Sequence, residues 1–430
     1  MISKSRLLIL ISIIFCSSVL AQNVESFDIN GLKVILKQNT ANDIISANLF
    51  FKGGVTILDE DQAGLENLTL IVAQKATKNY TKEQLNSELE AMNSQINSNS
   101  NLDYSSLSLL CVKQNFKESW NIFSDIILNP LFSEEDLNLE RDKMIANIKQ
   151  INDNPDAYLQ KLSSEGFYVD HPYSVSVNGT EATLSSFTTK DLSDFYTQRL
   201  KTSEMLFVIV GNVTKPEVEK MVGDSFAKLE RGNYKQVMPP AVTHAEPSVK
   251  VVERELPTNY IQGIYSAPSR GTADGYTMLI MNSILRDRVW EEVRTKRSLS
   301  YAPSAIYRSN FSNYGGIYVT AVDPDTTIKV MITELEKLKN DPITDKELTD
   351  KIRQFITFYY LGIETNQAQA NILAFYELSG VGYKDVKNFL SHINKITPQD
   401  IQSVAQKYIK NLQFVLIGNP ASLEVSSFMY

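Results

Sequence analysis

The two halves of the 430-residue chain repeat one structural plan, and this duplication limits the folds that the chain can adopt. Residues 188–213 read TTKDLSDFYTQRLKTSEMLFVIVGNV, and residues 397–420 read TPQDIQSVAQKYIKNLQFVLIGNP. Each segment has a threonine at the expected start of a helix, apolar residues at three- to four-residue spacing, and a short apolar run before Gly-Asn. The pattern predicts a helix followed by a buried strand that ends at a turn.

Two earlier pairs of segments show the same correspondence. Residues 31–40 (GLKVILKQNT) and 44–54 (IISANLFFKGG) have the pattern of the two strands of a hairpin, and residues 248–256 and 260–271 repeat it in the second half. A duplication of about two hundred residues is too long for a solenoid repeat. The sequence therefore predicts an α+β fold of two homologous domains, each a mostly antiparallel sheet with helices packed on one face.

The segment between the halves sets the expected domain limits. Residues 231–247, RGNYKQVMPPAVTHAEP, are rich in proline and lack apolar periodicity. We expect an N-terminal domain at residues 22–232, a linker at 233–247 and a C-terminal domain at 248–430.

The first 21 residues have the pattern of a secretory signal peptide. Lys4 and Arg6 precede an apolar run, and Val19 and Ala21 are small residues at the −3 and −1 positions of a cleavage site after Ala21. The competing hypothesis is a membrane anchor, but the apolar run is shorter than the roughly 20 residues that a spanning helix needs. The mature chain is therefore expected to be exported and to keep no membrane anchor.

Charge and cysteine content argue against several classes of partner and of fold. The chain has 42 Lys and Arg against 50 Asp and Glu, a net charge of −8, and removing Lys4 and Arg6 with residues 1–21 leaves −10 on 409 residues. Such a balance argues against nucleic acid and anionic membranes as partners. Cys111 is the one cysteine of the mature chain and lies in an apolar run, which predicts a buried thiol and no disulfide framework.

Several short segments occur in an order that is typical of a known family. They are FFKGG (50–54), AGLENLTL (63–70), NPLFSEEDLNLERDKM (129–144), HPYSVSVNGTEATL (171–184), WEEVRTKRSLSYAPSA (290–305) and GGIYVTA (315–321). In their order and spacing, the chain resembles the insulinase/pitrilysin family of zinc peptidases, in the branch that includes mitochondrial processing peptidase. The resemblance extends over nearly all of the mature chain.

The resemblance implies a zinc site that this sequence has lost. Relatives hold zinc with His-x-x-Glu-His on one helix, where two histidines one turn apart ligate the metal and the glutamate acts as general base. Asn67, Leu70 and Ile71 stand at these three positions, and Asn147 stands at the position of the downstream glutamate ligand. Leucine and isoleucine cannot ligate zinc, so we expect a packed core helix here and no cofactor in this chain.

A second functional motif of the family is retained. Relatives carry an arginine and a tyrosine seven residues apart that hydrogen-bond the substrate backbone and stabilise the developing oxyanion. Arg294 and Tyr301 match this spacing, although Arg297 makes the alignment ambiguous. The alternative is that Arg294 is a surface helix residue and Tyr301 a packing residue of a strand. The Gly/Ser-rich loop that usually precedes this segment is absent.

The resemblance also implies a place for the peptide. An extended peptide can add to a free sheet edge by backbone pairing. Residues 97–106 and 313–320 are the candidate edges, although their composition fits ordinary loop-to-strand transitions equally well.

Two functions remain open on the sequence. In one, the chain is the zinc-free subunit of an exported, heterodimeric metallopeptidase, and it supplies Arg294 and Tyr301 in trans to a homologous partner that carries zinc. In the other, it is a non-enzymatic peptide-binding or scaffold protein. In either case short or unfolded peptides are the expected ligands, and the family resemblance favours the periplasm over the cell exterior.

Overall fold

The computed structural model describes residues 24–430, so the expected signal peptide lies outside the described residues. The N-terminal sheet has the order β1-β2-β6-β3-β5-β4, and the C-terminal sheet has the order β7-β11-β8-β10-β9. The strands of the first sheet are β1 (Val24–Ile29), β2 (Leu32–Gln38), β3 (Ile44–Lys52), β4 (Gln95–Ser100), β5 (Tyr104–Val112) and β6 (Met205–Gly211). Those of the second are β7 (Ser248–Glu253), β8 (Asn259–Ala267), β9 (Ser304–Tyr307), β10 (Asn313–Ala321) and β11 (Gln413–Gly418).

The two sheets confirm the duplication. Strands β2, β6, β3, β5 and β4 take the places of β7, β11, β8, β10 and β9, and β1 is an addition to the first sheet. In each sheet one pair is parallel, β2 with β6 and β7 with β11, and the other pairs are antiparallel. The expected α+β fold with two homologous, mostly antiparallel sheets is therefore correct.

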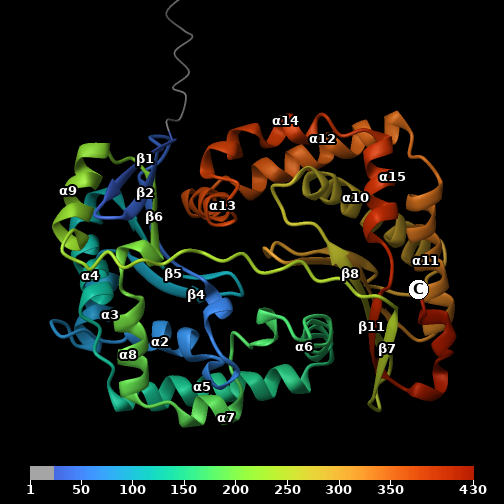
Figure 1. The fold of residues 1–430 in the computed structure, drawn as a ribbon, viewed down its shortest axis with the longest axis horizontal. Coiled ribbons are helices and arrows are strands. Elements are labelled where there is room, and N and C mark those ends of the chain that lie inside the picture. The colour runs from blue at the N-terminus through green and yellow to red at the C-terminus, as the bar shows by residue number, and fades with distance from the viewer. Residues whose placement is uncertain (1–23) are drawn as a thin grey trace, which may run out of the picture.

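In both halves the helices alternate with the strands along the chain (Figure 1). Those of the N-terminal half are α2 (Leu65–Ala73), α3 (Lys82–Ala91), α4 (Phe116–Leu128), α5 (Glu134–Asp153), α6 (Pro155–Phe167), α7 (Glu181–Ser186), α8 (Thr189–Arg199) and α9 (Lys215–Phe226). Those of the C-terminal half are α10 (Ala273–Val289), α11 (Pro324–Asn340), α12 (Asp345–Gly362), α13 (Asn366–Leu378), α14 (Phe389–Ile393) and α15 (Pro398–Tyr408). No helix within residues 24–430 has the length and apolar content that crossing a membrane requires.

The repeated threonines begin helices, as the sequence predicts. Thr188 caps α8 and Thr397 caps α15, and each side-chain oxygen accepts the backbone N–H three residues later, which satisfies one of the free donors of the first turn. The apolar runs that follow become β6 and β11, which are interior strands of their sheets and are buried along their whole length.

The two halves cover each other's sheets. Helix α13 of the C-terminal half lies against β6 and β3, where Leu373 and Ala374 pack on Val208 (Figure 1). Helix α6 of the N-terminal half lies against β11 and β8, where Leu159 packs on Val415. Each sheet therefore has its own helices on one face and a helix of the other half on the opposite face, so the halves share apolar cores.

The segment between the halves is a structured strap. Residues 231–247 contain no helix or strand and cross from one half to the other (Figure 1). The imidazole Nε2 of His171 donates to the carbonyl of Pro240 at 2.9 Å, and that of His244 contacts the carbonyl of Phe167 at 3.2 Å. Gln236 donates to the carbonyl of Leu378 at 2.8 Å. Two of the three histidines therefore hold the strap in place.

One expected sheet edge is wrong. Residues 313–320 lie in β10, which pairs with β8 on one side and with β9 on the other. The edge strands of the described sheets are β1 and β4 in the first and β7 and β9 in the second. Strand β4 includes part of the other expected edge at 97–106, and β9 is a short strand of four residues. The sequence missed β9 because four residues are too few to show a period.

Candidate functional site

The helix that holds zinc in the family is here part of the apolar core. Gly64 caps α2 with a φ of 86°, and a Cβ there would lie 2.7 Å from the Cα of Gly179, so this turn requires glycine. Leu70 is 3% exposed and packs into the core of the first sheet. Ile71 packs with Met144 of α5. The space between α2 and α5 is thus closed by aliphatic side chains.

The other two positions of the lost site carry amides. Asn67 is half-buried and donates to Asn178 at 3.4 Å, and Asn147 is exposed on α5. These four side chains do not fit zinc, because two are hydrocarbon and the amides are poor ligands for this ion. Within residues 24–430, no group of three His, Cys, Asp or Glu side chains is placed to hold a metal ion.

Two glutamates are buried near α2. Glu140 of α5 forms ion pairs with Lys75 at 3.1 Å and Lys143 at 2.9 Å. Burial acts to raise the pKa of Glu140, but the hydrogen bonds from the two lysines outweigh it and hold the pKa below its ordinary value. Glu66 of α2 is fully buried, and burial raises its pKa despite the charge of Arg199. Neither glutamate stands at a ligand position of the family motif, so no motif in the sequence pointed to them.

Arg294 and Tyr301 lie together at the end of α10. The helix continues into the π-helical turn η6 (Trp290–Thr295), which presents the Arg294 guanidinium 4.4 Å from the centre of the Trp290 ring and 5.4 Å from that of Tyr301. The guanidinium also donates to the backbone carbonyl of Tyr301. Tyr301 is 84% exposed and lies in the loop before β9, so its ring does not pack in a sheet.

The neighbouring basic side chains are engaged elsewhere. Glu292 forms ion pairs with Lys296 at 2.6 Å and Arg297 at 2.5 Å, and these two hydrogen bonds lower the pKa of Glu292 to about 2. Arg294 has no carboxylate partner among the residues that the structure describes. Of the two arginines that the sequence leaves as candidates, only Arg294 keeps its charge available for a ligand.

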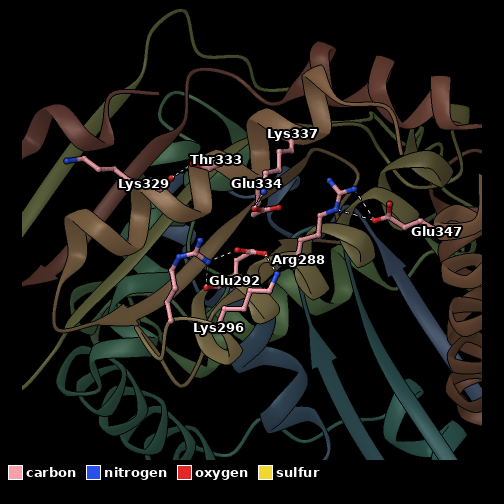
Figure 2. Close-up of polar contacts among 9 residues, drawn as sticks. Arg288, Glu292, Lys296, Lys329, Thr333, Glu334, Lys337 and Glu347 are labelled. Carbon is pink, nitrogen blue, oxygen red and sulfur yellow. Dashed lines mark hydrogen bonds and ion pairs between the residues drawn. The ribbon is translucent and has the colours of Figure 1, made fainter. Parts of the chain in front are cut away.

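The surrounding surface is held by further ion pairs. Figure 2 shows Glu292 beside Lys296, together with the pairs Arg288–Glu347 at 2.9 Å and Lys337–Glu334 at 2.6 Å. The Arg288–Glu347 pair joins α10 to α12, and Lys337 places a cation beside the buried carboxylate of Glu334 on α11.

Comparisons with known proteins agree with this architecture. The family model described as "Insulinase (Peptidase family M16)" matches residues 33–181, and the one described as "Peptidase M16 inactive domain" matches residues 186–355. An uncharacterized zinc protease of Rickettsia felis is 23% identical over 412 residues, which cover 94% of this chain and 96% of that protein. Another, from Mycobacterium leprae, is 23% identical over 410 residues and covers 91% of each chain.

Solved structures share the fold over almost the whole chain. A peptidase M16 inactive domain from Pseudomonas fluorescens superposes with a TM-score of 0.84 at 19% identity, covering 92% of this chain and 98% of that one. A protease from Helicobacter pylori gives a TM-score of 0.84 at 17% identity, covering 92% and 99%. Because both halves match these models in sequence and the duplicated fold matches in space, the chain belongs to the insulinase family of peptidases and carries no zinc motif.

Proposed function

We propose that this chain is the zinc-free subunit of an exported, two-chain peptidase and that it presents Arg294 and Tyr301 to a peptide bound by a homologous, zinc-bearing partner. The observation that carries the proposal is the state of this pair. Arg294 is fixed by Trp290 and lacks a carboxylate partner within residues 24–430, while Tyr301 is exposed. Two such donors side by side, one in the turn η6 and one in the loop that follows it, suit a ligand that arrives from outside the chain.

The chemistry of the pair fits a peptide carbonyl. The guanidinium is a permanent, forked donor, and the phenol donates one further hydrogen bond. Donors of this kind stabilise a carbonyl oxygen as it gains negative charge, and losing one typically costs about a hundredfold in rate. The chain itself supplies no metal ligand and no general base at α2, so the partner must provide both.

The test combines the mature chain with a His-x-x-Glu-His homologue from the same cells. We expect neither protein alone to hydrolyse a mixed peptide pool and the mixture to do so. Arg294→Ala or Tyr301→Phe should then lower the activity of the mixture at least about tenfold. Arg297→Ala is the matched control, because Arg297 is held by Glu292 and should leave the activity within about twofold.

Other outcomes separate the alternatives. A mixture that stays fully active with both Arg294 and Tyr301 replaced contradicts the role in trans. If the chain purifies from its own cells without a zinc-bearing homologue, it acts instead as a peptide-binding or scaffold protein, a role that the apolar filling of α2 equally allows. Fractionating the cells tests the expected periplasmic location.

A further inference from the structure

A cavity of about 940 Å³ lies over the β9 edge of the C-terminal sheet. Strand β9 pairs with β10 alone among the described strands, and both faces of β9 line the cavity, through residues such as Ser304 and Tyr307. Helix α6 of the N-terminal half borders one side, and α10 and α12 border the other.

This cavity repeats the position of the lost zinc site. Helix α10 follows β8 and packs beside the edge strand β9 and α12, as α2 follows β3 and packs beside β4 and α5. In the N-terminal half this space is closed by Leu70 and Ile71, whereas its counterpart in the C-terminal half is open and lined by both polar and apolar side chains. The duplicated fold thus forms equivalent spaces in the two halves, and only the space in the C-terminal half has room for a ligand.

Buried polar atoms in the cavity wall lack partners. Gln262 of β8 is 0% exposed, yet neither its amide nitrogen nor its amide oxygen has a hydrogen-bond partner within the described part of the chain. The Nε of Arg270 and the Oδ1 of Asn282 are also buried and have no hydrogen-bond partner among the described residues. Buried polar groups without partners destabilise a fold by about 1–3 kcal/mol each, so such groups gathered at one cavity indicate that it takes a polar ligand.

The register of the strands places one of these groups in line with the edge. Gln262, Tyr318 and Ser304 are Cα partners across β8, β10 and β9, so they form one row that ends at the free edge. The phenol of Tyr318 donates to Asp156 of α6. A strand added beside β9 would continue this row.

The charged side chains that line the cavity favour an anionic ligand. Arg270, Arg286 and Arg308 line the cavity, and none forms an ion pair with a carboxylate of residues 24–430. Arg308 donates only to the neutral Gln160 at 3.1 Å and Tyr314 at 3.0 Å. Asp156 is the single acid among the lining residues. On a chain of net charge −8, this is a local excess of positive charge.

We propose that this cavity binds an extended peptide that pairs with β9 and places a carboxylate among Arg270, Arg286 and Arg308. The inference rests on the proposed function and deepens it, since it names the substrate class as peptides with an acidic side chain or a C-terminal carboxylate in this position. Backbone pairing at a free edge gives affinity, and alternating side chains reach both faces of the sheet. Arginine recognises a carboxylate through two parallel hydrogen bonds.

The test measures peptide binding to the mature chain alone by fluorescence anisotropy. The probes are one alanine-rich peptide with a free C-terminus, the same peptide amidated, and the amidated peptide with two internal glutamates. We expect the free or the glutamate-bearing peptide to bind at least about tenfold tighter than the neutral one, which identifies the source of the carboxylate. Equal affinity for all three peptides overturns the proposal.

Substitutions assign the binding to this cavity. Arg286→Gln, at an exposed position, should lower the affinity for the acidic peptide by about tenfold. The double variant with Arg286→Gln and Arg308→Gln should lower it further, and neither variant should change the affinity for the neutral peptide. Arg353→Gln on α12 is the control, because Arg353 is exposed, carries the same charge and does not line the cavity. Unchanged affinity in folded double variants overturns the site. Because this assay needs no zinc-bearing partner, acidic peptides bound by a chain that activates no partner would refute the proposed function and leave this site intact.

Discussion

The buried carboxyl of Asp103 joins the two halves and predicts how stability depends on pH. Asp103 precedes β5 and is 4% exposed. Its carboxyl accepts hydrogen bonds from the phenol of Tyr173 and, at 3.1 Å, from the backbone N–H of Phe311 in the C-terminal half. Burial raises the pKa of Asp103 to about 7, although both hydrogen bonds act to lower it.

The sign of the effect follows from this shift. The pKa of Asp103 in the folded chain lies above its ordinary value of 3.8, so the folded state binds the proton more tightly than the unfolded state. The resulting stabilisation is complete below pH 3.8 and is lost as the pH rises through about 7. From these two pKa values, the loss in the free energy of unfolding between pH 5 and pH 8 is about 2–3 kcal/mol.

Two histidines act in the opposite direction. Burial lowers the pKa of His171 and of His244, so their contribution to stability is present above their ordinary pKa of 6.5 and is lost as the pH falls. The pH profile of the natural chain alone therefore does not isolate Asp103. A comparison with Asp103→Asn does, because both proteins contain the same histidines.

The assay is urea denaturation of the natural chain and of Asp103→Asn at pH 5 and pH 8. The stability of the natural chain relative to the variant should fall by about 2–3 kcal/mol from the lower to the higher pH. Asp61→Asn, at an exposed position in the turn η2 (Glu60–Gln62), is the control and should follow the natural profile. Parallel profiles for Asp103→Asn and the natural chain would refute the reasoning.

Two further outcomes follow from the packing. Leu373→Ala should lower the free energy of unfolding by about 2–5 kcal/mol, because this 2%-exposed side chain of α13 lies in the core shared by both halves. Leu361→Ala, at a 56%-exposed position, should cost less than about 0.5 kcal/mol in the same urea titration, and equal losses for the two would contradict the shared core. The Cys111 thiol is 2% exposed, and burial raises its pKa to about 12. Iodoacetamide at pH 8 should therefore modify it at least about a hundredfold more slowly in the native chain than in urea. Equal rates in the two conditions would show that the thiol is accessible in the native chain.

Local sequence patterns were enough to predict much of the fold. Thr188 and Thr397 were recognisable as helix caps because a cap needs only a side-chain oxygen three residues before an N–H. The runs that became β6 and β11 were recognisable because a fully buried strand is apolar at every position. The apolar character of α2 also followed directly from Leu70 and Ile71 at positions where a metal site needs histidine and glutamate.

The candidate binding residues could be predicted only in part from the sequence. The spacing of Arg294 and Tyr301 suggested a pair, but the choice between Arg294 and Arg297 required the ion pairs of Glu292, which depend on the turn η6. Gln262 gave no signal, because a lone glutamine in a strand becomes informative only when its neighbours leave its amide without a partner.

The sequence by itself determined the duplication, the α+β class and the loss of the zinc ligands, since each is visible in short segments of the chain without knowing how those segments pack together. Tertiary structure alone decided that α6 and α13 each pack on the sheet of the other half and that β9 rather than β10 forms an edge. It also decided that the cavity beside α10, the counterpart of the lost zinc site, stays open. The physical reason is that an amphipathic helix or strand specifies that one face must be buried and does not specify the surface that buries it.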